Sequence, residues 1–140
     1  WWLLRSAPVL AALAAIAGHN WPVFLKFRGG RGVATFFGGL LALCPAAALF
    51  SGQLVILGAG LTRFASLASI TGAVATYVIL VPLTIFNGFP IEYLAYALIG
   101  TITIAVTHRD NIIRLLNGKE RKIGDKTEIT KPPPAVTSAG

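Results

Sequence analysis

The sequence predicts an all-α polytopic membrane protein, a bundle in which about five helices cross or re-enter the bilayer. Of its 140 residues, 55% are hydrophobic and only 12% are charged, and the mean hydropathy is +0.73. Long stretches carry almost no charge, and the basic residues behind the net charge of +7 gather at their ends. Because that placement follows the positive-inside rule, it favours anionic lipid or substrate over nucleic acid as a partner. The composition excludes an ordinary soluble domain.

The first half of the chain alternates apolar runs with one basic loop. Residues 2–17 are long enough for most of a spanning helix, and residues 18–32 form the loop. The apolar run 33–50 follows and is broken near its end by Pro45. As a helix, residues 53–62 would rise only about 15 Å, against a hydrocarbon core of roughly 30 Å. We therefore expect this last stretch to be re-entrant or to borrow residues that precede it.

The second half is predicted to hold two spans and a surface segment. Residues 65–86 can cross the bilayer with some tilt. After an Asn-Gly-Phe-Pro turn, residues 91–107 return through the membrane. Residues 108–122 are basic with apolar side chains at helical spacing, which indicates an interfacial helix. The membrane-embedded domain should therefore cover residues 1–122, and the proline-containing residues 123–140 should form a disordered cytoplasmic tail.

The placement of charge predicts the orientation of the chain. Basic side chains gather in residues 18–32, at Arg63 and in residues 108–122, whereas residues 87–92 contain no Lys or Arg. The three basic regions and the C-terminus should lie in the cytoplasm, because basic flanks favour that side. This orientation requires that the two apolar stretches between the loop and Arg63 make separate passes.

The basic, glycine-punctuated loop is the first candidate site. Gly29, Gly30 and Gly32 let the backbone turn freely and let a ligand approach it closely. The apolar run that follows predicts a helix N-terminus, which favours anions, and Arg31 adds a guanidinium that can grip a phosphate. We interpret the loop as a phosphate cradle, although the nucleotide-binding pattern G-x-x-x-x-G-K-[ST] is absent. The alternative is that its basic residues only fix the orientation of the neighbouring helices.

The exit of the last predicted span carries the second candidate group. On a helix, His108 and Asn111 share one face. His108 can be a general base, a donor to phosphate or an ordinary interfacial residue, and Asn111 can bind a ligand or cap a helix. Glu120, among lysines and arginines, is in the simplest interpretation a solvated ion-pair partner. Ser66 and Ser69 can turn their hydroxyls to the same membrane face or serve helix packing.

Three polar clusters on one membrane face predict a pocket that opens to the cytoplasm beside lipid. Such a pocket suits a reaction between one polar and one fatty substrate. An anion transporter or channel subunit is the alternative, because glycine-broken helices point their N-termini at substrates there too. That alternative predicts polar residues through the membrane midplane, whereas here they concentrate at one face. A lipid-binding scaffold is a third hypothesis, and it would tolerate neutral substitutions of His108 and Asn111.

Two segments resemble motifs of the bacterial acyl-phosphate:glycerol-3-phosphate acyltransferases, the PlsY family. The family's second motif is similar to G-H-N-W-P-V-F-L-K-F-R-G-G-R-G-V-A-T, and its third motif is similar to H-R-D-N-I-I-R-L-L-N-G-K-E-R-K. The resemblance, which covers residues 2–122, implies a seven-helix enzyme of the bacterial inner membrane with a cytoplasmic active site. Such enzymes transfer a fatty acyl group from acyl phosphate to the sn-1 hydroxyl of glycerol 3-phosphate. The product is lysophosphatidic acid for phospholipid synthesis, and no metal or other cofactor is needed.

The resemblance also implies roles for individual residues. His108 and Asn111 would form the catalytic face, with Glu120 holding the third motif in place. Ser69, or else Ser66, would touch glycerol 3-phosphate. The residues that the resemblance implies in substrate binding are His19, Asn20, Gly29, Gly30, Arg31, Gly32, Ser69 and Arg109.

The chain departs from the family's pattern at two points. Arg31 stands where the family usually has lysine, so a point charge has become a planar fork that should still bind phosphate. The family's first motif, a loop rich in Ser, Gly, Asn, Ala and Thr, is absent, and we expect it upstream of Trp1 with two further helices. The chain that starts at Trp1 is therefore expected to be inactive or unstable on its own.

Overall fold

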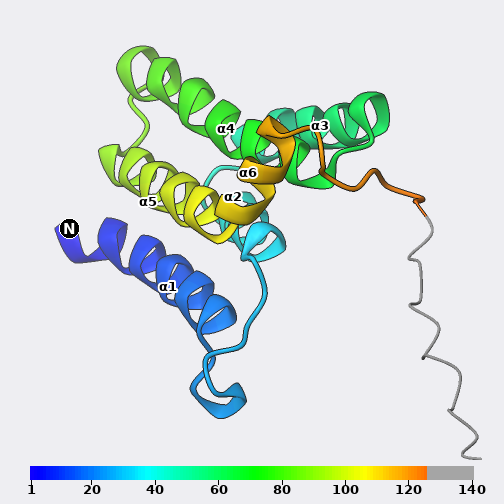
Figure 1. Cartoon of the computed structure of the whole chain (residues 1–140). Coiled ribbons are helices and arrows are strands. Elements are labelled where there is room, and N and C mark those ends of the chain that lie inside the picture. The colour runs from blue at the N-terminus through cyan, green and yellow to red at the C-terminus, as the bar shows by residue number, and fades with distance from the viewer. Residues whose placement is uncertain (126–140) are drawn as a thin grey trace, which may run out of the picture.

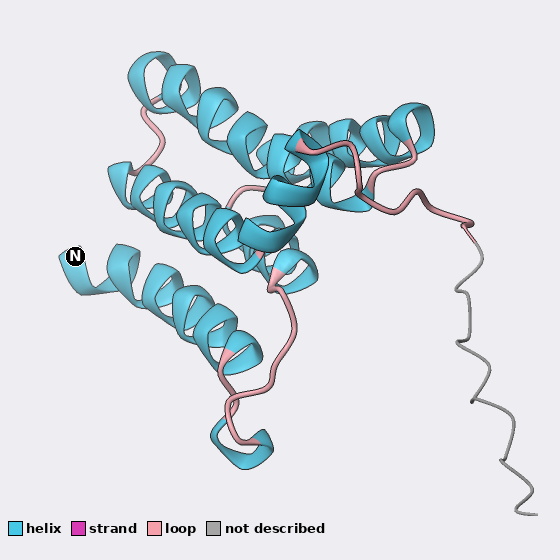
Figure 2. Ribbon diagram, in the orientation of Figure 1, coloured by secondary structure: helices cyan, strands magenta, loops and turns pink. Residues whose placement is uncertain are grey.

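A computed structural model describes residues 1–125, which fold into helices joined by short loops (Figures 1 and 2). The predicted all-α fold class is confirmed, and residues 1–125 contain no strand. Residues 126–140, most of the predicted tail, lie outside the described residues. The elements are α1 (Trp2–Asn20), the 3-10 helix η1 (Val23–Leu25), α2 (Val33–Leu43), α3 (Pro45–Thr62), α4 (Ala65–Asn87), α5 (Ile91–Thr107) and α6 (Arg109–Leu116).

The long helices pack in a closed series of neighbours. Each of α1 to α5 contacts the next helix along the chain, and α5 closes the series by contacting α1. Figure 1 shows α4, α5 and α1 as three adjacent rods, with α2 near the middle of the view. Helix α2 also contacts α5, so this short helix packs against α1, α3 and α5.

The core is built where α2 meets α5. Phe36, Leu40 and Tyr96 are fully buried, and the rings of Phe36 and Tyr96 stack with centroids 5.4 Å apart. The Tyr96 hydroxyl donates to the carbonyl oxygen of Phe36 at 2.8 Å, so its buried polar atom is satisfied. Gly100 lies directly against the Phe36 ring, where a Cβ atom would overlap the ring carbons. The aromatic contact therefore depends on the absence of a side chain at residue 100.

Within residues 1–125, three helices are long and apolar enough to cross a membrane: α1 with its extension to Leu25, α3 and α4. Helix α5 gives a fourth candidate if it is joined to α6 across a bend of 64°. Helix α2 has only 11 residues. These five apolar helices correspond to the five predicted transmembrane or re-entrant segments.

The structure corrects the boundary predicted between the second and third apolar segments. Instead of a run over 33–50 and a separate stretch over 53–62, the chain breaks just before Pro45 and continues as one helix. Proline suits the first position of a helix, because its missing N–H needs no partner there. Ser51, at the predicted gap, donates to the carbonyl oxygen of Ala47 at 2.6 Å and so remains helical. The third segment therefore borrows residues that precede it, and the short helix is α2.

The predicted interfacial helix over residues 108–122 is shorter than expected. Helix α6 ends at Leu116, and Gly118 takes a positive φ of 67°, which glycine adopts without strain. His108 lies at the bend between α5 and α6, outside both helices. The basic residues beyond Gly118 therefore belong to a non-helical segment.

We predict that Gly100→Ala destabilises the protein, because the added methyl group overlaps the buried ring of Phe36. Overpacking of this kind typically costs about 1–3 kcal/mol, so the midpoint of thermal unfolding in detergent should fall. Gly60→Ala is the matched control, since a Cβ atom there meets open space and alanine favours a helix by up to about 1 kcal/mol. Equal midpoints for the two variants would contradict this account of the core.

Candidate functional site

The glycine-rich loop folds back onto the C-terminal end of α1. The amide of Gly30 donates to the carbonyl oxygen of His19 at 3.1 Å. A Cβ atom at Gly29 would overlap backbone oxygens of α1, and one at Gly30 would overlap the His19 imidazole. A Cβ atom at Gly32 would lie 2.6 Å from Oδ1 of Asn20, and Gly32 has a φ of 74°. Packing against the backbone of α1 therefore requires glycine at residue 29, and the positive φ favours it at residue 32, whether or not a ligand approaches them. At residue 30 a side chain would require the His19 imidazole to move.

Asn20 lies beneath this loop with 4% of its surface exposed. Neither its Oδ1 nor its Nδ2 has a hydrogen-bond partner in the part of the chain that the structure describes. Because an unpaired buried amide is costly, a further polar group is expected to reach it. This residue lies close to Gly32, where α2 begins.

His108 is held in one orientation at the end of α5. Only 2% of its surface is exposed, and its Nδ1 lies 2.8 Å from the carbonyl oxygen of Ile104. Since a carbonyl oxygen can only accept, Nδ1 carries the proton, and Nε2 of the neutral ring keeps a lone pair. Burial lowers the pKa of His108, and Arg31 acts in the same direction. These effects outweigh the Ile104 bond and Glu120, which raise the pKa, so the neutral ring is favoured.

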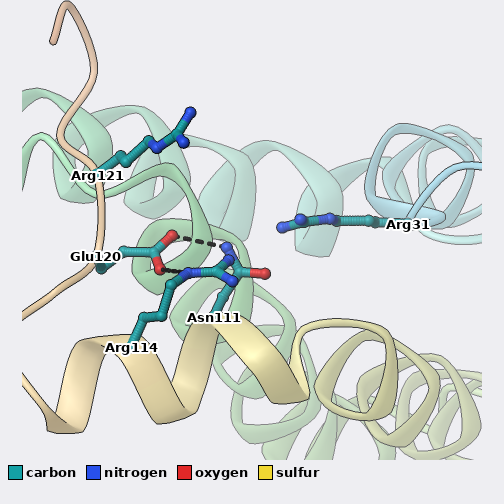
Figure 3. Close-up of a pocket in the computed structure, with 5 residues that line it drawn as sticks. All are labelled: Arg31, Asn111, Arg114, Glu120 and Arg121. Carbon is teal, nitrogen blue, oxygen red and sulfur yellow. Dashed lines mark hydrogen bonds and ion pairs between the residues drawn. The ribbon is translucent and has the colours of Figure 1, made fainter. Parts of the chain in front are cut away.

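Glu120 ties three segments of the chain together. Its carboxylate accepts from Asn111 Nδ2 at 2.6 Å and from Arg114 Nε at 2.8 Å (Figure 3). It also accepts from Ser66 Oγ at 3.2 Å. Its side chain is only 8% exposed, so it is not the solvated ion-pair partner of the simplest interpretation. Because Nδ2 of Asn111 is engaged by Glu120, Oδ1 is turned away from the carboxylate, toward Arg31 (Figure 3).

The hydrogen bonds also determine the charge of Glu120. Burial raises the pKa of this carboxyl, but the hydrogen bonds from Arg114, Asn111 and Ser66 and the charge of Arg114 together bring it below its usual range. The carboxylate form is therefore favoured, and Glu120 acts as an acceptor in all three bonds.

Arg31 of the glycine loop, helix α6 and the segment that follows α6 line one pocket of about 330 Å³. Arg31 reaches in from the loop side, opposite the group around Glu120 (Figure 3). The carbonyl oxygen of Arg31 also accepts a 3.3 Å hydrogen bond from the hydroxyl of Thr107, the residue before His108. With three guanidinium groups and one carboxylate, the pocket favours an anion. Its lining residues are Arg31, Asn111, Arg114, Glu120 and Arg121.

Of the predicted site residues, Arg31, Asn111 and Glu120 line this pocket, whereas the others, among them His108, do not. Arg109 is 75% exposed and pairs with Asp110 at 3.9 Å. Ser69 donates to the carbonyl oxygen of Ala65 within its own helix, whereas Ser66 reaches Glu120. Ser66 therefore belongs to the group around Glu120, and contact of Ser69 with glycerol 3-phosphate stays a prediction.

Sequence reasoning did not single out Arg114 and Arg121 as site residues. Arg114 follows Asn111 by three residues on α6, so helical spacing alone could have placed both on one face. Arg121 lies outside any helix, and no periodic pattern indicates its direction.

Comparison with known proteins identifies the family. Residues 1–118 match the family model described as glycerol-3-phosphate acyltransferase. The chain belongs to this family. It is 68% identical over 123 residues to glycerol-3-phosphate acyltransferase 3 of Dehalococcoides mccartyi (strain CBDB1), covering 88% of this chain and 57% of that protein.

More distant members of the family give the same result. The chain is 42% identical over 120 residues to the glycerol-3-phosphate acyltransferase of Halalkalibacterium halodurans, covering 86% of this chain and 58% of that one. The chain thus spans little more than half the length of these curated relatives. Among solved structures it resembles PlsY, an integral membrane glycerol 3-phosphate acyltransferase, in its glycerol 3-phosphate form. That match has a TM-score of 0.75 and 37% identity, and covers 83% of this chain and 56% of the other.

A second PlsY structure, the lysophosphatidic acid form, matches with a TM-score of 0.74 and 34% identity. It covers 87% of this chain and 68% of that chain. With its apolar helices and its family membership, this chain is a polytopic membrane segment of the glycerol-3-phosphate acyltransferase family.

We predict that Glu120 makes the stability of this fold fall at acid pH. A carboxyl whose pKa is lowered on folding stabilises the fold fully above its unfolded value of about 4.3 and loses that contribution as the pH falls through the folded value. Thermal unfolding between pH 7 and pH 3 should therefore show a larger acid loss for the wild type than for Glu120→Gln. Asp110→Asn, which removes a carboxylate that is 73% exposed, should keep the wild-type profile. Superimposable profiles for wild type and Glu120→Gln would contradict the assignment.

Proposed function

We propose that this chain contributes the anion-binding and catalytic face of an acyltransferase of the bacterial inner membrane. The enzyme moves a fatty acyl group from acyl phosphate to the sn-1 hydroxyl of glycerol 3-phosphate and forms lysophosphatidic acid for phospholipid synthesis. The observation that carries the proposal is the cationic pocket in which Arg31 faces Asn111, close to the buried His108. The names of the two solved PlsY structures, a glycerol 3-phosphate form and a lysophosphatidic acid form, support the same acceptor and product.

Two phosphorylated substrates require two cationic subsites, and the geometry supports this division. Arg31 and the N-terminus of α2 behind Gly32 offer one subsite on the loop side. Arg114 and Arg121 offer charge on the opposite wall. Arginine binds phosphate with two parallel hydrogen bonds, so both walls can orient an anion as well as attract it.

The reaction requires the enzyme to orient its two substrates more than to form a covalent intermediate with one of them. The acceptor hydroxyl oxygen bonds to the acyl carbonyl carbon, the bond from that carbon to the phosphate oxygen breaks, and inorganic phosphate leaves. The hydroxyl proton passes to Nε2 of His108, which keeps a lone pair, or to a phosphate oxygen. Positioning of the two substrates and stabilisation of the developing charge then supply most of the rate acceleration.

The proposed site opens to the cytoplasm at the end of the bundle where the basic residues gather. The loop that holds Arg31 contacts the end of α5, and the turn at Arg63 contacts residue Ile123 beyond α6. All three basic regions are therefore neighbours at one end of the helices. The positive-inside rule assigns such an end to the cytoplasm, where soluble glycerol 3-phosphate can enter while the acyl donor arrives from the lipid.

In the intact protein we predict that Arg31→Ala and Asn111→Ala each lower kcat/KM by about a hundredfold or more, because each removes a pre-oriented group from the pocket. Arg31→Lys should keep activity within about tenfold of wild type, since it retains the charge but not the fork. Arg5→Gln, which removes a cation next to Trp1 at the other end of α1, is the control and should be near wild type. Purified wild type that fails to acylate glycerol 3-phosphate from acyl phosphate would refute the proposed reaction.

A second prediction decides which group takes the proton. If it is His108, kcat/KM falls on the acid side with a pKa below the ordinary imidazole value of about 6.5, because protonation blocks Nε2. His108→Ala should then abolish this acid limb and lower kcat/KM by about a hundredfold or more. A limb that persists in His108→Ala would assign the proton to a phosphate oxygen of the substrate.

A further inference from the structure

A non-helical strap, residues 117–125, runs from the end of α6 to the turn between α3 and α4 (Figure 1). It is anchored there by Arg63, whose carbonyl oxygen accepts from the amide of Ile123 at 2.6 Å. The guanidinium of Arg63 donates back to the carbonyl oxygen of Ile123, from Nε at 3.1 Å and from Nη2 at 2.7 Å. One arginine therefore satisfies both backbone groups of one strap residue.

The backbone of Arg63 adopts a conformation that is costly for any residue other than glycine. Arg63 follows the last residue of α3 with a φ of 60°, in the left-handed region where glycine is the favoured residue. The hydrogen bonds that its side chain makes to the strap offset part of the cost of that conformation. On the strap, Gly124 has a φ of 90°, and a Cβ atom there would lie 3.3 Å from Nη2 of Arg63. A side chain at residue 124 would therefore crowd the guanidinium.

Three further contacts lie around the anchor. Nη2 of Arg63 lies 3.9 Å from Oδ1 of Asp125, and Oδ2 of the same carboxylate accepts from the amide of Lys122 at 2.9 Å. The Nζ atom of Lys122 lies 5.8 Å from the centre of the Phe64 ring. Because the ion pair is half exposed, it adds little by itself. The main attachment is the backbone hydrogen bond between Ile123 and Arg63 together with the two side-chain hydrogen bonds from Arg63 to Ile123, and the latter two depend on the guanidinium.

Glu120 lies on this strap, between Lys119, whose amide donates to the carbonyl oxygen of Arg114 at 2.7 Å, and the anchored Ile123. From this position its carboxylate reaches inward and fixes the amide of Asn111. We propose that Arg63 is a positioning residue for the acyl-transfer site: by holding Ile123 it keeps Glu120 bonded to Asn111 and Arg114. This inference rests on the proposed function, because it assigns Arg63 a role in the same reaction.

A double-mutant cycle in the intact protein tests the inference. Arg63→Gln should lower kcat by about tenfold, since it removes charged hydrogen bonds to the strap. If Arg63 acts through Glu120, the double variant Arg63→Gln/Glu120→Ala should lose no more activity than Glu120→Ala alone. Losses that multiply would show that Arg63 acts independently, and they would overturn the inference. Lys119→Gln, which removes an exposed cation from the same strap, is the control and should be near wild type.

Hydrogen–deuterium exchange supplies a readout that needs no activity. In Arg63→Gln, peptides covering residues 117–125 should exchange about tenfold faster, while peptides from α4 and α5 keep the wild-type rate. Unchanged exchange in the strap would overturn the inference, and faster exchange throughout would show general unfolding instead of loss of the anchor, which overturns it as well. Wild type that exchanges normally but transfers no acyl group would refute the proposed function alone.

Discussion

The buried carboxylate of Glu120 is the interaction on which the rest of the candidate site depends. Removing a carboxylate from water is expensive unless its oxygens receive good hydrogen bonds, and here α4 supplies one donor and α6 supplies two. One of these donors is the side-chain Nδ2 of Asn111. The contact that stabilises the charge of Glu120 therefore also orients the side-chain Oδ1 of Asn111. Stability of the fold and geometry of the pocket are therefore set by one group.

The opposite wall of the pocket depends on a different constraint, the close approach of the glycine loop to α1. A side chain at residue 29 would overlap the backbone of α1, one at residue 32 would overlap Asn20, and one at residue 30 would require His19 to move. This packing brings Arg31 to the mouth of the pocket, where Thr107 bonds its backbone. A phosphate-binding loop and a tightly packed loop share the same glycine pattern, and in this chain the packing alone explains it.

Sequence reasoning predicted the features that follow from local chemistry. Hydropathy predicted the apolar helices. The placement of basic residues predicted that the glycine loop and the exit of α5 lie at the same end of the bundle. Sequence reasoning failed at two points. It separated the second and third apolar segments after residue 50 although it also marked Pro45 as a break, but Ser51 bonds its own helix and the break lies before Pro45. Glu120 looked solvated because its partner Ser66 lies 54 residues away, beyond any pattern of spacing.

A crystal structure of the intact protein with glycerol 3-phosphate bound tests the central claim most directly. The account predicts that the ligand's phosphate lies within hydrogen-bond distance of the Arg31 guanidinium, in the pocket that Asn111 faces, with Glu120 still bonded to Asn111. A ligand bound elsewhere, or a structure in which Arg31 and Asn111 do not share a pocket, would contradict it.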